Sequence, residues 1–319
     1  MKEISRPSKQ DIIEASIRIA KSIHHTPVLS SKLLNELFGA ELFFKCENFQ
    51  KVGAFKSRGA VNAVLSLSKD ELSRGVCTHS SGNHAQALAR AAKIIGIKAY
   101  IVMPDNAPIV KIDAVKQYGG EITFCKPNLK AREDTIAKVI AKTGSTEIHP
   151  YNNIKIICGQ ATSAMELINE IPDLDIIIAP VGGGGLLSGT ALSANYFSPK
   201  TKVIAAEPLR ADDAYKSFRA KKLILSENPD TIADGLLTSL GSLTFPIIIN
   251  YVHDIVTVKE ESIIKAMKLI WERMKIIIEP SSAVPLASLI EKKIDINNKR
   301  IGIIISGGNV DLNKLPWMQ

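Results

Sequence analysis

Long apolar runs are missing from this chain of 319 residues. No stretch approaches the roughly 18 residues that a membrane-spanning helix needs, which argues against a membrane role. Cysteine is scarce: Cys46, Cys77, Cys125 and Cys158 are widely scattered and lack the C-x-x-C spacing of a metal site or redox pair. The N-terminus has no apolar core typical of a signal peptide. We therefore expect reduced, mostly buried thiols in a cytoplasmic protein.

Aromatic residues are also few, at 5% of the chain, although the net charge is +8. The lysines are spread along the sequence, and no basic stripe is interleaved with stacking rings as in a nucleic-acid-binding surface. With 45% apolar and 23% charged residues, the composition is that of an ordinary globular protein. The sequence therefore favours a protein that handles small anions over one that binds nucleic acid.

Linkers rich in proline, glycine or serine are absent, as are internal repeats and low-complexity tracts. Short, continuously apolar runs instead alternate with helical patterns from about residue 40 onward. This alternation is typical of an open α/β fold, with strands buried on both faces of a parallel sheet and helices on either side. The expected strands include 98–103, 175–179 and 301–305, and the expected helices are 83–95, 109–117, 129–143, 186–196 and 260–275.

The chain is long enough for one large domain or for two smaller ones that share a cleft. Because no linker separates them, a division into domains must be compact and discontinuous. Residues 75–149 hold several strand–helix units that could form a sheet of their own. We predict a small substrate-gating domain at 75–149, inserted in a larger domain of residues 1–74 and 150–319.

Lys56 is the most informative residue of the sequence. It lies within Lys51–Gly59, framed by glycine, alanine and phenylalanine, which predicts a partly desolvated ammonium group. Desolvation lowers the pKa of a lysine and makes the free amine available for Schiff-base chemistry. A solvated lysine at the start of a helix is the ordinary alternative, and it is favoured for a lysine considered alone.

Four loops rich in glycine or polar residues follow predicted strands. Open α/β sheets bind their ligands beyond the carboxyl ends of the strands, so these loops are expected to meet. Lys56 follows strand 40–47, Ser80–His84 follow strand 75–79, Gly182–Gly185 follow strand 176–181, and Ser306–Asn309 follow strand 301–305. Together with a desolvated lysine, the four loops predict a cofactor site.

Gly182–Gly185 predict a cradle for a phosphate group. Residues without a Cβ let successive N–H groups face one anion, and the next helix adds its positive N-terminal end. A tight turn between strand and helix would explain one or two of these glycines. A nicotinamide dinucleotide site is a sharper alternative, in which Glu207 would bind the ribose. However, Ser188 occupies the place of the third glycine of that motif, and Lys56 would have no role.

Ser306 indicates whether the ring nitrogen of a bound pyridine cofactor would be protonated. Pyridoxal enzymes often pair the ring nitrogen with a carboxylate, which keeps it protonated as a full electron sink. A serine hydroxyl leaves that nitrogen largely neutral, and this favours short-lived proton transfer or elimination over transamination. A serine in a glycine turn, with no chemical role, is the plain alternative.

These four segments resemble the serine racemase and serine/threonine dehydratase group of pyridoxal-phosphate enzymes, and the resemblance covers essentially the whole chain. It implies the tryptophan synthase β-like (fold type II) architecture and usually a homodimer. In that family Lys56 would carry the cofactor as a Schiff base, and Phe55 would pack near its ring. The remaining contacts would come from Asn83 to the ring hydroxyl, from Gly182, Gly183, Gly184, Gly185 and Leu186 to the phosphate, and from Ser306 to the pyridine nitrogen.

The resemblance places Ser81 on the side of the substrate opposite Lys56. Racemisation needs one group to remove the α-proton from one face and another to return a proton on the other face, and these two residues can supply the pair. A loop cap that contacts only the substrate carboxylate is the alternative for Ser81. Ser80 and His84 are expected beside the substrate. Arg132 matches the position of a substrate-gating arginine in the family. The alternative is a charged residue on the solvent-exposed side of a helix.

The segment Glu207–Asp213 resembles the divalent-cation site of the racemase branch. Glu207, the Ala211 carbonyl and Asp213 would be the ligands, a set that suits Mg²⁺, Ca²⁺ or Mn²⁺. The ion would stabilise the active fold rather than polarise the substrate. From the sequence alone, a helix N-terminus enriched in acidic residues is an equal alternative.

The nucleotide-activating site of the animal racemases is matched only in part. Lys32 and Val52 stand where those enzymes carry serine and threonine, which argues against activation by ATP. Tyr151, like the segment Cys158–Ala161, departs from the mammalian pattern toward the dehydratase and hydroxyaspartate-lyase branch. The matching positions are Ser31, Lys51, Gln86, Lys275 and Asn309.

We therefore predict a metal-stimulated serine racemase that also eliminates water from serine or threonine to give a keto acid and ammonia. One site should perform both reactions, because both begin with removal of the α-proton by Lys56. A dehydratase of threonine, serine or 3-hydroxyaspartate with little racemase activity is the alternative within the family. A non-catalytic protein that binds pyridoxal phosphate is the alternative outside it.

Overall fold

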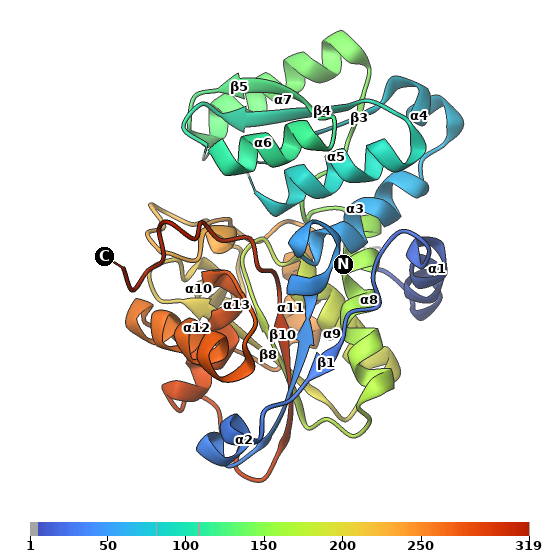
Figure 1. Cartoon of the computed structure of the whole chain (residues 1–319). Helices are drawn as coiled ribbons and strands as arrows, with labels where there is room; N and C mark the ends of the chain where they lie inside the picture. Colours follow the sequence, from blue (N-terminus) through green and yellow to red (C-terminus); the bar gives the residue numbers. More distant parts are fainter. Residues whose placement is uncertain (1–5, 81, 108, 319) are drawn as a thin grey trace.

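The computed structural model describes residues 6–80, 82–107 and 109–318, and it contains two sheets (Figure 1). In the larger sheet β1 pairs with β2 in antiparallel fashion, and every further pair is parallel. Its strands, in spatial order, are β1 (Val28–Leu29), β2 (Glu41–Cys46), β10 (Arg300–Ile305), β7 (Ile176–Pro180), β8 (Lys202–Pro208) and β9 (Asp254–Val258).

Helices cover both faces of this sheet. On β7, Ile176 and Ile178 belong to the core under one face, and Ile177 and Ala179 to the core under the other. All four are buried, which explains why the strand is a continuous apolar run. One face packs against α2 (Lys32–Phe38), α12 (Glu260–Met274) and α13 (Pro280–Ile290), and the other against α8 (Ile154–Glu170), α9 (Gly185–Phe197) and α11 (Thr244–Tyr251), with α1 (Lys9–Ile19) outside α8.

The smaller sheet is entirely parallel and lies above the larger one in Figure 1. Its strands in order are β5 (Glu121–Cys125), β4 (Ala99–Pro104), β3 (Val76–His79) and β6 (Thr146–Glu147). Helices α5 (Asn83–Ile95) and α6 (Ile109–Gln117) share the core of one face, and α7 (Leu129–Thr143) covers the other. These strands all fall within residues 75–149; the domain boundaries themselves stay a prediction.

Helix α3 (Lys56–Leu65) runs between the two sheets and is held by a buried ion-pair network. Arg58 Nε lies 2.7 Å from Glu47, and its Nη1 lies 2.6 Å from Glu166, which also pairs with Lys45 at 2.7 Å. A buried charge without its partner is strongly destabilising, so this network fixes the first turn of the helix. That turn begins with Lys56.

The remaining elements are short. They are α4 (Lys69–Arg74), α10 (Asp213–Ala220) and three 3₁₀ turns at Glu47–Phe49, Lys51–Gly53 and Asp234–Leu236. In the described ranges, no helix combines the length and apolar character needed to cross a bilayer. All four cysteines are buried and free, as expected.

Candidate active site

Two loops far apart in the sequence form one unit beside Lys56. Ala54 and Gly307 form an antiparallel bridge, and the N–H of Phe55 donates to the carbonyl of Ser306 at 3.0 Å. The N–H of Gly308 donates in turn to the carbonyl of Gly53 at 2.9 Å. The structure therefore brings the predicted lysine loop and the predicted serine loop together at the carboxyl ends of β2 and β10.

The Lys56 amine is enclosed in this unit. Its Nζ donates to the carbonyl of Pro150 at 2.8 Å and lies 5.2 Å from the ring centroid of Phe55. Burial lowers the pKa of Lys56 to about 8, against the opposing effect of the Glu279 carboxylate. The free amine is therefore populated near neutral pH, as a nucleophile or base at this position requires.

Asn83 belongs to a hydrogen-bonded row of polar side chains. Its Nδ2 donates to both carboxylate oxygens of Glu279, at 3.0 and 3.1 Å. Its Oδ1 accepts from Asn309 Nδ2 at 2.8 Å. Sequence reasoning missed Glu279. The signal that could have revealed it is a lone carboxylate directly after the apolar run Ile276–Ile278, in the same setting as the other site loops.

The tetraglycine loop follows β7, and α9 begins at its last residue. Gly184 has a φ of +86°, and a Cβ there would lie 2.8 Å from Thr244 Oγ1. A Cβ on Gly183 would lie 2.3 Å from the Tyr151 ring. Thr244 Oγ1 also donates to the Gly183 carbonyl at 2.9 Å, which fixes the loop. A backbone without side chains at the N-terminus of a helix suits a phosphate group, so these residues fit the predicted cofactor.

We expect Gly184→Ala to destabilise the protein by about 2 kcal/mol, because the new Cβ is crowded and the backbone is left-handed. Chemical denaturation measures the loss. Gly96→Ala is the matched control, since Gly96 has a φ of +73° and a Cβ there meets nothing within 4 Å. An equal loss in both variants would show that crowding around the tetraglycine loop contributes nothing.

Ser306 is buried at the end of β10. Its Oγ lies 2.9 Å from the hydroxyl of Ser282, which accepts from the N–H of Gly307 at 2.7 Å and donates to the Gly307 carbonyl at 2.7 Å. Ser282 was not predicted from the sequence. It holds the Ser306 hydroxyl in place from the first turn of α13.

Neutral aromatic groups surround the lysine. His84 Nε2 donates to the Ile148 carbonyl at 2.9 Å, and burial, aided by the Lys56 charge, holds the pKa of His84 well below its usual value. Burial likewise lowers the pKa of His149 to about 4. The His149 ring stands edge-on to Tyr151, with centroids 4.6 Å apart. Both histidines are therefore uncharged at neutral pH.

The other predicted substrate residues are placed as follows. Ser81 lies outside the described residues. The N–H of Ser80 donates to the Val102 carbonyl at 3.1 Å, which anchors the loop that precedes α5. Arg132 lies on α7, and its Nε is buried without a hydrogen-bond partner among the residues that the structure describes. The roles of these residues stay predictions.

The predicted cation site pairs two buried carboxylates. Glu207, at the end of β8, accepts from the N–H groups of Ala214 and Tyr215 at 3.0 and 2.8 Å. Both carboxylate oxygens of Asp213 are buried and lack a partner in the described part of the chain. Burial raises the pKa of Glu207 well above its usual value, with Asp213 adding to the effect, and burial raises the pKa of Asp213 to about 7.

Such orphaned oxygens fit a hard cation, which would supply the missing partner. No group of three or more His, Cys, Asp or Glu side chains that could hold a metal occurs among residues 6–80, 82–107 and 109–318. The donors predicted from the sequence are these two carboxylates and the carbonyl of Ala211, which is buried, and their role as metal ligands stays a prediction.

The five positions matched to a nucleotide site lie on separate elements. Ser31 caps α2, which precedes β2, whereas Lys51 follows that strand. Gln86 is buried on α5, and Lys275 ends α12. Asn309 donates to Asn83 and to the Val52 carbonyl, so it contacts a residue predicted to bind the cofactor.

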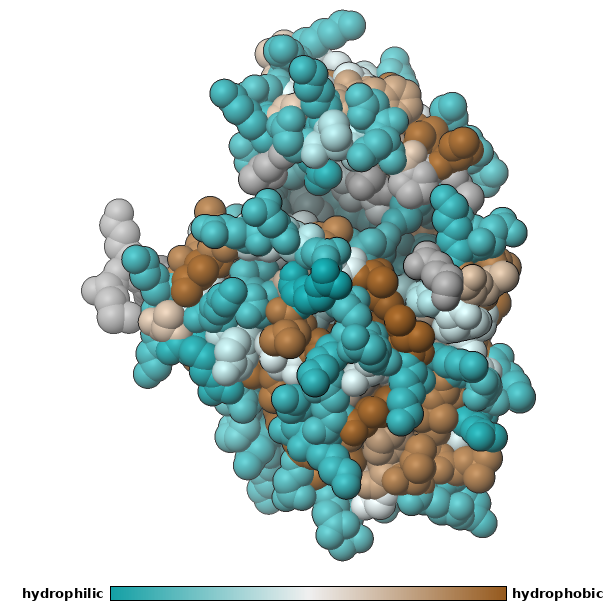
Figure 2. All heavy atoms as spheres, turned by 90° about the vertical axis from the view of Figure 1, so that its left-hand side faces the viewer, coloured by the Kyte–Doolittle hydropathy of each residue, from teal (hydrophilic) through white to brown (hydrophobic). Residues whose placement is uncertain are grey.

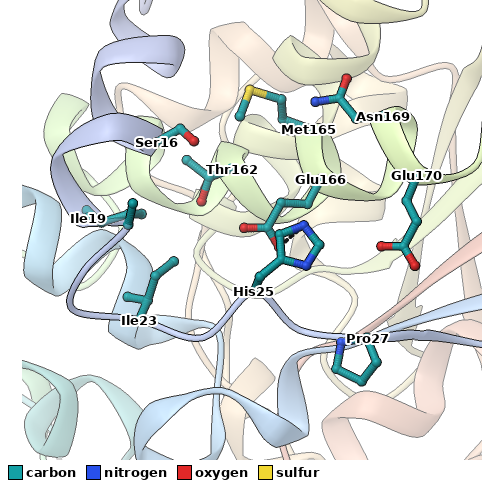
Figure 3. A pocket seen from close by; sticks show the side chains of 11 residues that line it. Ser16, Ile19, Ile23, His25, Pro27, Thr162, Met165, Glu166, Asn169 and Glu170 are labelled. Atoms are coloured by element: carbon teal, nitrogen blue, oxygen red, sulfur yellow. Dashed lines mark ion pairs between the residues drawn. The ribbon is translucent and has the colours of Figure 1, made fainter.

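The surface is hollowed where the parts built on the two sheets meet (Figure 2). A separate cavity of about 670 Å³ lies between α1, α8 and the segment that follows α1 (Figure 3). Its walls include Ile23, His25, Met165 and Glu166, and none of the residues predicted for cofactor or substrate lines it. We therefore place the candidate active site around Lys56 and not in this cavity.

Residues 19–307 match the family of pyridoxal-phosphate dependent enzymes. The chain belongs to this family, and its fold is the predicted fold type II architecture. Among curated proteins it is 52% identical to a serine racemase from Dictyostelium discoideum, over 99% of this chain and 98% of that protein. It is 51% identical to a beta-hydroxyaspartate dehydratase from Paracoccus denitrificans, over 98% of this chain and 99% of that protein. The solved structure of maize serine racemase has a TM-score of 0.95 and 45% identity, over 98% of this chain and 97% of that one.

Proposed function

We propose that this chain is a pyridoxal-phosphate-dependent serine racemase that also eliminates water from serine or threonine. One observation carries the proposal: the Lys56 amine is held against the Pro150 carbonyl, on a loop that is hydrogen-bonded to the Ser306 loop, in a chain about half identical to serine racemases. Asn83, Gly182–Gly185, Leu186 and Ser306 would hold the cofactor, with Phe55 beside it.

Bound pyridoxal phosphate would supply an electron sink that makes the α-proton of the substrate acidic. Lys56 removes that proton from one face and becomes an ammonium group. Ser81 returns a proton on the opposite face, which inverts the α-carbon. If the β-hydroxyl instead takes up a proton and leaves as water after the α-proton is removed, hydrolysis of the unsaturated amine that remains gives a keto acid and ammonia. The uncharged His84 and His149 keep the surroundings of Lys56 free of further cations.

A dehydratase of 3-hydroxyaspartate with little racemase activity is the second candidate. Two relatives are consistent with it: the Paracoccus dehydratase, and an L-threo-3-hydroxyaspartate ammonia-lyase from Saccharomyces cerevisiae that is 45% identical to this chain. Tyr151 also favours it, since this residue lies against the tetraglycine loop and departs from the mammalian racemase pattern.

The proposal has three further parts. Glu207, the Ala211 carbonyl and Asp213 bind Mg²⁺ or a similar divalent cation, supported by the unpartnered Asp213 oxygens. The enzyme is a cytoplasmic homodimer that takes a small amino acid as substrate, supported by the family resemblance and the four free cysteines. ATP is not expected to activate it, because Lys32 and Val52 break the nucleotide pattern.

Chiral chromatography of L-serine reactions, beside a keto-acid assay, tests the proposal. We expect both D-serine and pyruvate from the wild type. Ser81→Ala is expected to reduce racemisation by about a hundredfold or more, because the second proton donor is lost, while elimination continues. Ser73→Ala, an exposed serine on α4, is the control. Pyruvate without D-serine from the wild type would favour the dehydratase, and neither product from L-serine would contradict the proposal.

A further inference from the structure

The carboxylate of Glu279 is buried inside the candidate site, and the reaction described above gives it no role. Glu279 occupies the N-cap position of α13, where a short polar side chain such as aspartate ordinarily accepts a hydrogen bond from the first N–H groups of the helix. It makes no such bond. Both of its oxygens instead accept from Asn83 Nδ2. The carboxylate is therefore directed at the site and does not serve as a helix cap.

The hydrogen bonds around Glu279 have only one consistent direction. An asparagine amide can turn by half a rotation unless its partners distinguish oxygen from nitrogen. The Val52 carbonyl only accepts, so it takes a hydrogen from Asn309 Nδ2, at 2.7 Å. The second hydrogen of that nitrogen goes to Asn83 Oδ1, which leaves the Asn83 nitrogen for Glu279. The carboxylate completes a row that fixes the predicted cofactor residue Asn83.

Glu279 also lies next to the loop that carries Lys56: its N–H donates to the Gly307 carbonyl at 3.1 Å, and Gly307 forms the bridge with Ala54. From this position its negative charge opposes the lowering of the lysine pKa. Burial raises the pKa of Glu279 itself to about 7; Asp234 adds to this effect, and the Asn83 hydrogen bond and Lys111 oppose it. The charged groups that face Glu279 are therefore Lys56, Lys111 and Asp234, and the last two pair with each other. Over the range in which Lys56 titrates, Glu279 is mostly ionised.

We propose that Glu279 is a positioning residue for proton transfer at Lys56. It holds the Asn83 amide with its nitrogen toward the carboxylate, and it places one titratable negative charge beside the lysine. When Lys56 takes the α-proton, the proton bonds to the Nζ lone pair, and the nearby carboxylate stabilises the resulting ammonium. This inference rests on the proposed function, because it assigns a role within the same site.

Glu279→Gln tests this role, because the amide keeps the shape of the side chain and an acceptor for Asn83 but removes the charge. In the full chain stripped of cofactor, the pKa of Lys56 can be followed by pH-dependent acetylation and mass spectrometry. We expect the substitution to lower it from about 8 to about 7. Glu272→Gln, on the exposed side of α12, is the matched control and should leave it unchanged. An unchanged Lys56 profile in Glu279→Gln would overturn the inference.

The loaded enzyme gives a second readout. We expect wild-type kcat to rise through about pH 7 as Glu279 ionises, and Glu279→Gln to lose this limb together with about tenfold or more in kcat. Glu279→Asp, which retains the charge, should restore the limb. If kcat still rises through about pH 7 in Glu279→Gln, the assigned role is contradicted.

A further variant covers the case in which Glu279→Gln does not fold. Asp234→Asn removes a negative charge near Glu279 and does not alter Asn83. The rise of kcat near pH 7 should therefore move to lower pH in this variant. A rise at the wild-type pH would count against the inference. If neither the wild type nor any variant acts on serine, the proposed function fails. The acetylation measurement still decides the role of Glu279 in that case.

Discussion

Replacing Lys56 by alanine is expected to reduce both racemisation and elimination by about a thousandfold or more. The structure offers a direct reason, because the Lys56 amine is enclosed by Phe55 and the Pro150 carbonyl and its pKa is lowered to about 8. The proposed mechanism assigns no other base to that face of the substrate. Steady-state assays of D-serine and pyruvate measure the loss.

The same variant should also change the colour of the protein. The Lys56 amine is the group expected to bond the cofactor aldehyde, so Lys56→Ala should lack the absorbance of wild-type enzyme near the visible edge. Lys69→Ala, an exposed lysine at the start of α4, controls for general effects of removing a lysine. Full activity in Lys56→Ala would remove the basis of the proposed mechanism.

The second large effect is a gain in stability when a divalent cation binds the paired carboxylates of Glu207 and Asp213. Mg²⁺ or Ca²⁺ at a hundred times its dissociation constant should stabilise the wild type by about 2.7 kcal/mol, because it binds the folded state alone. Asp213→Asn should lose this stabilisation, since Asp213 supplies two unpartnered oxygens. Thermal melts with and without the cation measure the difference. Asp70→Asn, an exposed aspartate on α4, should respond as the wild type does.

The pH dependence of stability follows from the same pair. Burial raises the pKa of Asp213 from 3.8 to about 7, so between these values the folded state binds more protons than the unfolded state. Stability without a cation should therefore fall as the pH rises from about 4 to about 7. Added cation should offset this fall in the wild type. Asp213→Asn lacks the titrating carboxyl, so it should show neither the contribution of Asp213 to the fall nor the response to cation. Equal cation effects in both proteins would contradict a metal at this site.

Local sequence patterns predicted much of the fold. The helices at 83–95, 109–117 and 129–143 have the expected bounds. These features depend on neighbours three or four residues away, which a sequence displays directly. By contrast, α13 was not among the expected helices. Its residues 280–289 are all buried, so no exposed polar face produces the periodic pattern of an amphipathic helix. The helix also contains Pro285, which is typical of a break in a helix.

The candidate site divides in the same way. Lys56 and Gly182–Gly185 could be predicted because their loops carry an unusual local composition. Glu279 and Ser282 could not, since their roles arise from contacts with Asn83 and Ser306, which the fold brings from distant positions. A lone glutamate before a proline carries no such signal until the fold brings it into contact with Asn83.

The covalent attachment of cofactor at Lys56 tests the central claim most directly. Borohydride reduction of the holoenzyme, followed by proteolysis and mass spectrometry, identifies the modified residue. We predict one peptide whose mass is increased by reduced pyridoxal phosphate at Lys56. An unmodified Lys56, or a cofactor attached to another lysine, would contradict the account.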